Sequence, residues 1–417
     1  MLYDRWRAIA ANRQSETALW ETGSGRRWTF GQLDRAAGES KGLAGPVAFP
    51  QGHNAEFVLA VLVAWRRGQV VCPLELGQEP PQIISAPPWC AHLKTTSATT
   101  GQARLIAFRA AQLAADPAQL VTTMGLRPDW PNLAVISLAH SYGFSSLVLP
   151  LLLHGIPLII VPSPLPELLR AAARNESALT LPAVPTLWRA WDDAGCIPPS
   201  VRLALSAGPP LPLALEQRVF ARHGLKIHNF YGSSECGGIA YDRGEEPRTE
   251  ASLAGTAVDG VRLAAASDGC LEVRGPHVAE SYWPEPMDTL GHGLFHTADL
   301  AECRGAEVHL LGRASEVINV AGRKVAPETI ERALLAHPAV REALVVDLPS
   351  PTAAREVVIG AAIVAVPPVP EAELRRFLLE RLPAWQVPRA WLFVDALPVN
   401  QRGKLSRAEW RQRFAAS

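Results

Sequence analysis

The sequence predicts an α/β protein with a large N-terminal domain of covered, mostly parallel sheets plus a small β region, followed by a small α+β C-terminal domain. Helical apolar periods alternate with short, fully apolar strands in the first half of the chain, which indicates parallel sheets buried on both faces. Short strands with turn signals between about 253 and 312 predict the β region. At 417 residues and 48% hydrophobic side chains, the chain is long enough for two or three domains with their own cores.

Four helix-strand units produce the alternation in the N-terminal part. In each unit the apolar period of a helix ends at a Gly, and a short β-rich run follows. The predicted pairs are a helix at 56–68 with a strand at 69–74, 145–155 with 156–161, 181–195 with 201–208, and 212–224 with 225–232. After residue 315, the pattern predicts helices at 326–338 and 371–383 and strands at 340–347 and 357–366, which together make the C-terminal module.

Composition and charge exclude several classes of protein. The 40 basic and 40 acidic residues are spread evenly, so the chain lacks the basic footprint of a nucleic-acid binder. Six dispersed cysteines without a CxxC pair favour the reducing cytoplasm over a secreted setting. Residues 1–14 are typical of an amphipathic helix rather than a signal peptide, and the apolar run 147–162 is interrupted by Pro, Gly and His154, so no membrane span is expected.

Five polar segments contain candidate functional residues. They are residues 93–104 (LKTTSATTGQAR), 228–238 (HNFYGSSECGG), 293–300 (GLFHTADL), 311–331 (LGRASEVINVAGRKVAPETIE) and 397–407 (LPVNQRGKLSR). The first is dense in hydroxyls that can donate to phosphate oxygens, and the carboxylate of Asp299 in the third can accept two hydroxyls at once. Taken singly, each segment also fits a surface turn, a cap or a solvated charge.

The order and spacing of these segments resemble the adenylate-forming superfamily of acyl-CoA synthetases, luciferases and peptide-synthetase adenylation domains. The family motifs TSGTTGxPK, YGxTE, TGD, GRxxDxIKxxGxxxxPxEIE and PxTxxGKxxR correspond to TSATTGQAR, YGSSE, TAD, GRASEVINVAGRKVAPETIE and PVNQRGKLSR in this chain. The resemblance implies an ATP- and acid-binding domain at 1–314 and a mobile C-terminal lid at 315–417, with Ser315 as the hinge. Members usually carry Asp or Lys at the hinge. The phosphate loop begins earlier than in typical members, which implies a shortened N-terminal region.

The resemblance also implies residues for nucleotide and metal. A loop of Thr96, Ser97, Thr99, Thr100, Gly101 and Arg104 would hold the β and γ phosphates; Ala98, Ala103 and Arg104 depart from the family's Gly, Pro and Lys. The adenine and its surroundings would contact Ser206, Ala207, Gly208, Asn229, Phe230, Tyr231, Gly232, Ser233 and Ser234. Glu235 would hold Mg²⁺, Asp299 and Arg313 would bind the ribose, and Lys404 would bridge the acid, the ribose and the α-phosphate. Glu235, Arg313 and Lys404 are therefore the expected catalytic residues.

Further positions follow for the acid and the thiol. The family's acyl- and aryl-CoA ligases commonly place a His near the acid pocket where this chain has His140; a core or turn histidine is the alternative. The expected pocket walls are Gly208, Gly232, Gly238 and Ile239, and small residues there leave room for an aromatic or acyl group. Gly322 and Arg323 would line the entry of the thiol.

The function implied by the resemblance is ATP-dependent activation of an aryl or medium-chain acyl carboxylic acid to an acyl-adenylate, with release of pyrophosphate and transfer to coenzyme A. The cofactors would be ATP, Mg²⁺ and coenzyme A. One alternative is an enzyme that loads the phosphopantetheine thiol of an acyl carrier protein, because no motif above specifies the thiol. Another is an inactive relative that binds nucleotide, which the joint presence of Glu235, Asp299, Arg313 and Lys404 disfavours.

Overall fold

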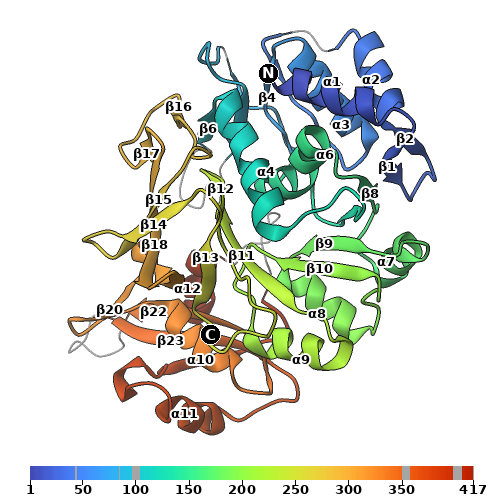
Figure 1. Cartoon of the computed structure of the whole chain (residues 1–417). Coiled ribbons are helices and arrows are strands. Elements are labelled where there is room, and N and C mark those ends of the chain that lie inside the picture. The colour runs from blue at the N-terminus through green and yellow to red at the C-terminus, as the bar shows by residue number, and fades with distance from the viewer. Residues whose placement is uncertain (43–44, 84, 96–103, 350–356, 398–405, 417) are drawn as a thin grey trace.

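The structure is a computed structural model that describes residues 1–417 apart from 43–44, 84, 96–103, 350–356, 398–405 and 417 (Figure 1). The helices are α1 (Leu2–Asn12), α2 (Phe30–Glu39), α3 (Ala55–Arg66), α4 (Ala110–Met124), α5 (Ser141–Gly143), α6 (Leu149–His154), α7 (Pro166–Ala173), α8 (Pro185–Asp193), α9 (Leu213–His223), α10 (Pro327–Leu335), α11 (Glu371–Leu379) and α12 (Arg407–Ala416), with shorter turns η1 (Phe144–Val148), η2 (Ala314–Glu316) and η3 (Ala384–Gln386).

The strands divide between the large N-terminal part and the smaller C-terminal part. The first group is β1 (Thr17–Glu21), β2 (Arg27–Thr29), β3 (Val47–Ala48), β4 (Val70–Val71), β5 (His92–Thr95), β6 (Leu105–Phe108), β7 (Asn132–Ala134), β8 (Leu158–Ile160), β9 (Leu179–Ala183), β10 (Val201–Ser206), β11 (Ile227–Ser233), β12 (Gly237–Tyr241), β13 (Leu253–Ala257), β14 (Arg262–Ala265), β15 (Cys270–Arg274), β16 (Ser281–Trp283), β17 (Leu290–Gly291), β18 (Leu294–Arg304) and β19 (Glu307–Arg313). The second is β20 (Ile318–Val320), β21 (Arg323–Val325), β22 (Val340–Pro349), β23 (Val357–Ala365) and β24 (Ala390–Phe393).

One large sheet organises the N-terminal part, with its strands in the order β14-β15-β18-β19-β13-β12-β11-β10-β9-β7-β8-β1-β2. The strands from β11 to β1 pair in parallel, and pairing turns antiparallel at β11–β12 and beyond. The α/β class with mostly parallel sheets is therefore confirmed for the first half. The small β region continues this same sheet, because β12 pairs with both β11 and β13.

Helices cover both faces of the parallel strands. In β8, Leu158 and Ile160 pack into a core with α1, α2, α3 and α6, whereas Ile159 between them packs with α7, α8 and α9. This alternation is the pleat of a strand buried on both sides. A second sheet, in the order β16-β6-β5-β4-β3, lies beside the first (Figure 1).

Two details differ from the sequence predictions. The segment 181–195 is not one helix: Leu179–Ala183 forms β9, and α8 begins at Pro185, whose fixed φ suits the first helical turn. All five residues of β9 are buried between β7 and β10, so packing decides for the strand. The apolar residues before Asp299 predict a strand that ends ahead of it, but Asp299 lies inside β18, at an irregularity in its pairing.

The C-terminal part has its own cores, one around α10, α11 and β23 and one where Trp410 of α12 packs on β22 and β23. Arg407, at the start of α12, joins three carboxylates: its guanidinium lies 3.0 Å from Glu316, 2.9 Å from Glu328 and 2.7 Å from Glu331. This network fastens α12 to α10 and to the turn η2 that follows β19. The boundary at 314/315 and the mobility of the lid stay predictions.

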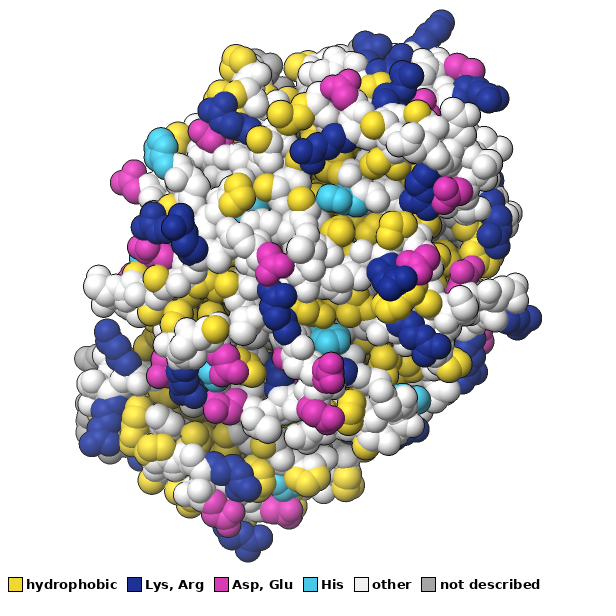
Figure 2. All heavy atoms as spheres, in the orientation of Figure 1, with side chains coloured by type: hydrophobic (Ala, Val, Ile, Leu, Met, Phe, Trp, Pro, Cys, Tyr) yellow, Lys and Arg dark blue, Asp and Glu magenta, His cyan; other side chains and the backbone are white. Residues whose placement is uncertain are grey.

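On the face in Figure 2, basic and acidic side chains are interspersed. Among the described residues, no helix is both long and apolar enough to span a bilayer.

We predict a pH-dependent weakening of the C-terminal part through Glu328. Burial raises the pKa of Glu328 to about 7, with Arg407 opposing the shift and Glu316 reinforcing it. Since this carboxyl ordinarily titrates near 4.5, its stabilising contribution is full below that pH and is lost as pH rises through about 7. The free energy of unfolding of Glu328→Gln, relative to that of the parent chain, should therefore rise by about 2 kcal/mol from pH 5 to pH 8. Chemical unfolding at both pH values measures the difference. The exposed Glu371→Gln is the control, and an equal response of both variants would contradict the prediction.

Candidate active site

Three of the predicted residues, Tyr231, Asp299 and Arg313, are joined by hydrogen bonds to the Asp299 carboxylate. Asp299 of β18 accepts a hydrogen bond from the Tyr231 hydroxyl at 2.5 Å on Oδ2 and one from Arg313 Nε at 3.1 Å on Oδ1. Arg313 lies opposite Asp299 in the β18–β19 ladder, while Tyr231 comes from β11. The structure thus brings together one aromatic ring, one carboxylate and one guanidinium from segments far apart in sequence.

The charges of this cluster are well defined. Burial, and then the neighbouring Asp299 carboxylate, raise the pKa of Tyr231 well above its usual value. The phenol therefore stays protonated and donates a hydrogen bond to Asp299. Burial acts to lower the pKa of Arg313, but the Asp299 and Glu316 carboxylates more than offset it and the pKa is raised. Asp299 is therefore a carboxylate held by two fixed donors.

Ser206 and Asn229 lie side by side because β10 and β11 pair in parallel with these two residues in register. Asn229 Nδ2 donates to the carbonyl of Ala254 at 3.1 Å, and the fully buried Ser206 Oγ has no partner among the described residues. After Ser206 come the buried Ala207 and the exposed Gly208, whose φ is +92°. Carboxyl ends of parallel strands are the usual place of ligand sites in open α/β sheets.

The hairpin from β11 to β12 carries Glu235 at its turn. Tyr282 of β16 donates from its hydroxyl to Glu235 Oε1 at 3.0 Å. A Cβ on Gly232 would lie 2.5 Å from the carbonyl oxygen of Gly237, so the close approach of the two strands requires glycine. Phe230 is buried in the core, and Ser233 and Ser234 are half-buried beside the turn. Glu235 is thereby presented by a tight turn and oriented by Tyr282.

The strands that flank the predicted phosphate loop are in place. β5 and β6 pair antiparallel, with Thr95 opposite Leu105, and β6 pairs in turn with β16, which carries Tyr282. Arg104 directs Nη1 to the sulfur of Met287 at 2.8 Å. The predicted loop and lid residues Thr96, Ser97, Thr99, Thr100, Gly101 and Lys404 lie outside the described residues.

The positions predicted for the acid, His140, Gly238 and Ile239, lie in different surroundings. His140 is exposed and caps the short α5, where Nδ1 accepts from the Tyr142 amide at 3.2 Å. A Cβ on Gly238 would meet Leu120 at 2.6 Å, and Ile239 is fully buried, so both pack into the core below the hairpin. Their contact with substrate stays a prediction.

The positions predicted for the hinge and the thiol entry follow β19. Ser315 is exposed within η2. Gly322, with φ of +83°, closes the turn between β20 and β21, and the Arg323 guanidinium lies 5.7 Å from the Trp385 ring.

Sequence reasoning missed a buried polar group beneath the hairpin. Lys94, 6% exposed, lies 3.4 Å from Ser145 Oγ and 4.7 Å from the Phe108 ring. Burial lowers the pKa of Lys94, while Asp116, Cys236 and Glu235 act in the opposite direction. Asp116 in turn accepts a hydrogen bond from the Gly238 amide at 3.0 Å. The strand position of Lys94 could have been inferred, but these contacts across the chain could not.

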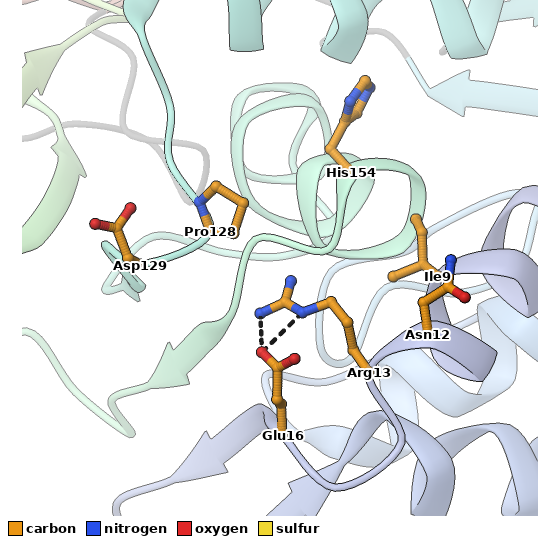
Figure 3. Close-up of a pocket in the computed structure, with 7 residues that line it drawn as sticks. All are labelled: Ile9, Asn12, Arg13, Glu16, Pro128, Asp129 and His154. Atoms are coloured by element: carbon orange, nitrogen blue, oxygen red, sulfur yellow. Dashed lines mark hydrogen bonds and ion pairs between the residues drawn. The ribbon is translucent and has the colours of Figure 1, made fainter.

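A separate hollow of about 480 Å³ lies away from these residues (Figure 3). It is lined by Ile9, Asn12, Arg13, Glu16, Pro128, Asp129 and His154. Arg13 and Glu16 pair with each other there at 2.6 Å, and none of the lining residues belongs to the predicted site.

Comparison with known families identifies the class of protein. The AMP-binding enzyme family matches residues 79–283, and the AMP-binding enzyme C-terminal domain matches residues 329–404, together about two thirds of the chain. The chain therefore belongs to the adenylate-forming, AMP-binding enzyme family, as its motifs predicted.

Individual relatives support the same class. The chain is 28% identical over 363 residues to a feruloyl-CoA synthase of Amycolatopsis sp, covering 81% of this chain and 72% of the relative. It is 28% identical over 334 residues to the 2-succinylbenzoate–CoA ligase of Bacillus cereus (strain Q1), covering 76% and 69%. The o-succinylbenzoate CoA synthetase of Bacillus subtilis, solved with its acyl-adenylate, superposes with a TM-score of 0.84 at 21% identity over 98% of this chain and 97% of that one, which confirms the fold.

We predict that Tyr282→Phe weakens Mg²⁺-dependent ATP binding by about tenfold, because the Glu235 carboxylate loses the charged hydrogen bond that orients it. Calorimetric titration of ATP at varied Mg²⁺ measures the change. Tyr3→Phe in α1 is the control, and an unchanged Mg²⁺ requirement in Tyr282→Phe would refute the orienting role.

We predict opposite effects of Lys94→Met on stability and on binding. Because burial disfavours the charged form of Lys94 more than the nearby carboxylates favour it, an apolar side chain of similar length should leave the unfolding midpoint unchanged or higher. The loss of a cation near Glu235 should weaken ATP binding severalfold. Thermal unfolding tests the prediction for stability, and ATP titration tests the prediction for binding. A large drop in the unfolding midpoint of Lys94→Met would contradict the first.

Proposed function

We propose that this protein activates a carboxylic acid with ATP to form an acyl-adenylate and pyrophosphate, and then transfers the acyl group to the thiol of coenzyme A. The observation that carries the proposal is the Asp299 carboxylate held between Tyr231 and Arg313, beside the turn that presents Glu235. Membership of the AMP-binding enzyme family supports it, as do relatives named as CoA synthase and CoA ligase.

The nucleotide would lie over the carboxyl ends of β10 and β11. Both oxygens of Asp299 already accept hydrogen bonds, so the carboxylate is positioned to accept the two ribose hydroxyls in place of, or beside, these donors. The Tyr231 ring and the segment Ser206–Gly208 would enclose the adenine, with Asn229 within reach of its amino group. Arg313 would add a second donor to the ribose.

Glu235 fits a magnesium ligand by its donor chemistry. It offers carboxylate oxygens, which hard divalent cations prefer, and Tyr282 already orients one of them. When bound, Mg²⁺ would neutralise charge on the phosphates. The protein's part is to hold Glu235 at the β11–β12 turn, and the predicted phosphate loop at 96–104 would bind the phosphates.

Neither of the two half-reactions requires a nucleophile from the protein. In the first, an oxygen of the substrate carboxylate attacks the α-phosphorus in line, the bond to the β-phosphate oxygen breaks, and pyrophosphate leaves. In the second, the thiol sulfur attacks the acyl carbonyl, its proton passes to solvent, and AMP leaves with the electron pair. Lys404 would bind the developing charge in the first step. Rotation at Ser315 would then bring Gly322 and Arg323 to the thiol.

We propose an aryl or medium-chain acyl acid as the substrate. The relatives are named for feruloyl and 2-succinylbenzoate groups, and the small residues Gly208 and Gly232 at the expected pocket positions would leave room for an aromatic group near His140. All six cysteines are free thiols, which supports our proposal that the protein acts in the reducing cytoplasm.

Pyrophosphate release from ATP and Mg²⁺ across a panel of aryl and acyl acids tests the proposal. Each positive acid is then repeated with coenzyme A and with a phosphopantetheinylated carrier protein. Thioester formation with coenzyme A is the expected result. If a thioester forms only with the carrier protein, the thiol acceptor is an acyl carrier protein and not coenzyme A. If no acid gives pyrophosphate release, the result favours an inactive nucleotide-binding relative.

Lys404→Ala should lower adenylate formation by at least about 10²- to 10³-fold, the cost of removing a preorganised donor to a charged transition state. Pyrophosphate release with the best acid measures the loss, and circular dichroism checks the fold. Lys41→Ala, an exposed lysine in the N-terminal part, is the matched control. Equal activity of the two variants would show that the motif is misassigned.

A further inference from the structure

Three side chains with metal-ligating atoms meet at the outer end of the large sheet. Asp268 lies in the turn between β14 and β15, Cys270 begins β15, and His296 lies on the neighbouring β18. Their ligand atoms all lie within 4.8 Å of one another. In Figure 1 these strands lie on the left of the molecule, at the end of the large sheet opposite to β1 and β2. The three residues belong to none of the nucleotide, acid or thiol positions above.

The orientation of His296 leaves one ring nitrogen facing the cluster. Its Nδ1 lies 3.1 Å from the carbonyl oxygen of Thr297, and because a carbonyl only accepts, Nδ1 carries the hydrogen. The other nitrogen, Nε2, faces Asp268 Oδ2 at 3.3 Å. A proton or a cation has to lie between these two atoms. A backbone carbonyl that holds one ring N–H is also the usual outer partner of a metal-binding histidine.

Asp268 is oriented too. Its Oδ1 accepts a hydrogen bond from the Cys270 amide at 2.9 Å, which leaves Oδ2 directed toward His296. The Asp268 side chain is 55% exposed and that of His296 is 29% exposed, so an ion can enter from solvent. Cys270 lies below them at 4% exposure. The three atoms thus form an open pocket with one sulfur, one nitrogen and one oxygen.

We propose that Asp268, Cys270 and His296 bind a zinc ion, with water in the fourth position. Zinc takes sulfur, nitrogen and oxygen ligands in a tetrahedron, whereas Mg²⁺ and Ca²⁺ take oxygen ligands. The edges of such a tetrahedron measure roughly 3.3–3.8 Å for bond lengths of 2.0–2.3 Å. The present separations therefore need only small side-chain rotations. On binding, the Cys270 thiol gives its proton to solvent and the thiolate bonds to the metal.

The position of the site links it to the nucleotide cluster. Glu272 pairs with His296 and Cys270 pairs with Leu300, and the register shift between these pairs spans Thr297, Ala298 and Asp299 of β18. Cys270 and His296 therefore lie at opposite ends of the irregularity that contains Asp299, and a metal ion bound by both would tie β15 and β18 together across it. This consequence for Asp299 depends on the proposed function, but zinc binding itself does not.

Metal titration of the full chain tests the proposal. The protein is stripped with a chelator and titrated with Zn²⁺, and separately with Co²⁺ as a spectroscopic probe, in the absence of ATP and acid. The variants are Cys270→Ser, His296→Gln and Asp268→Asn. Cys303→Ser is the matched control, because Cys303 is an exposed cysteine on the same β18.

We expect one equivalent of Co²⁺ to give a thiolate charge-transfer band in the near ultraviolet that Zn²⁺ displaces. The band should persist in Cys303→Ser and disappear in Cys270→Ser, and His296→Gln should bind at least about tenfold more weakly, the scale on which even outer partners change metal affinity. Zn²⁺ should also raise the unfolding midpoint of the parent chain and of Cys303→Ser by a few degrees.

Two results would overturn the proposal: no stoichiometric Co²⁺ binding by the folded parent chain, or an unchanged band in Cys270→Ser. If Cys270→Ser does not fold, the variants of the two exposed ligands decide, and unaltered affinity in both would refute the site. Because no substrate is present, this outcome is independent of whether acid activation is observed.

Discussion

The hydrogen bond between Tyr231 and Asp299 depends on the curvature of the large sheet. Three strands, β12, β13 and β19, separate β11 from β18 in the strand order. In a flat sheet the two strands would lie about 19 Å apart, farther than the two side chains can span. The sheet must therefore curl for these residues to meet at 2.5 Å.

Irregular pairings supply that curvature. The register shifts at Tyr231/Gly232, at Leu253/Gly255, and on both ladders of β18 around Leu300. Bulges of this kind bend a strand and increase its twist. At Gly255, where φ is +124°, a Cβ would lie 2.2 Å from the backbone of Tyr241, so glycine permits the close approach. The bends that bring Tyr231, Asp299 and Arg313 together thus depend on backbone geometry as well as on these three side chains.

The sequence predicted the alternation of helices and strands and the segments that contain Tyr231, Asp299 and Arg313, because periodicity and motif spacing are local. It could not predict that Tyr282 orients Glu235 or that Asp116 binds the Gly238 amide, since these pairs are 47 and 122 residues apart. The misplaced start of α8 has a similar cause. Leu181 and Ala183 fit a helical period, but burial between two strands decides their structure. Tertiary contact overrides local preference where a short segment fits either state.

The Arg407 network bears on how the C-terminus can be handled experimentally. One guanidinium contacts the acidic side chains of Glu316, Glu328 and Glu331, and it comes from a residue ten positions before residue 417. A deletion that removes α12 would leave these three acidic side chains together without the guanidinium that joins them. An affinity tag is therefore better appended at this end than exchanged for the last helix, and a protease that trims the tail past Arg407 would loosen α10 and η2 together.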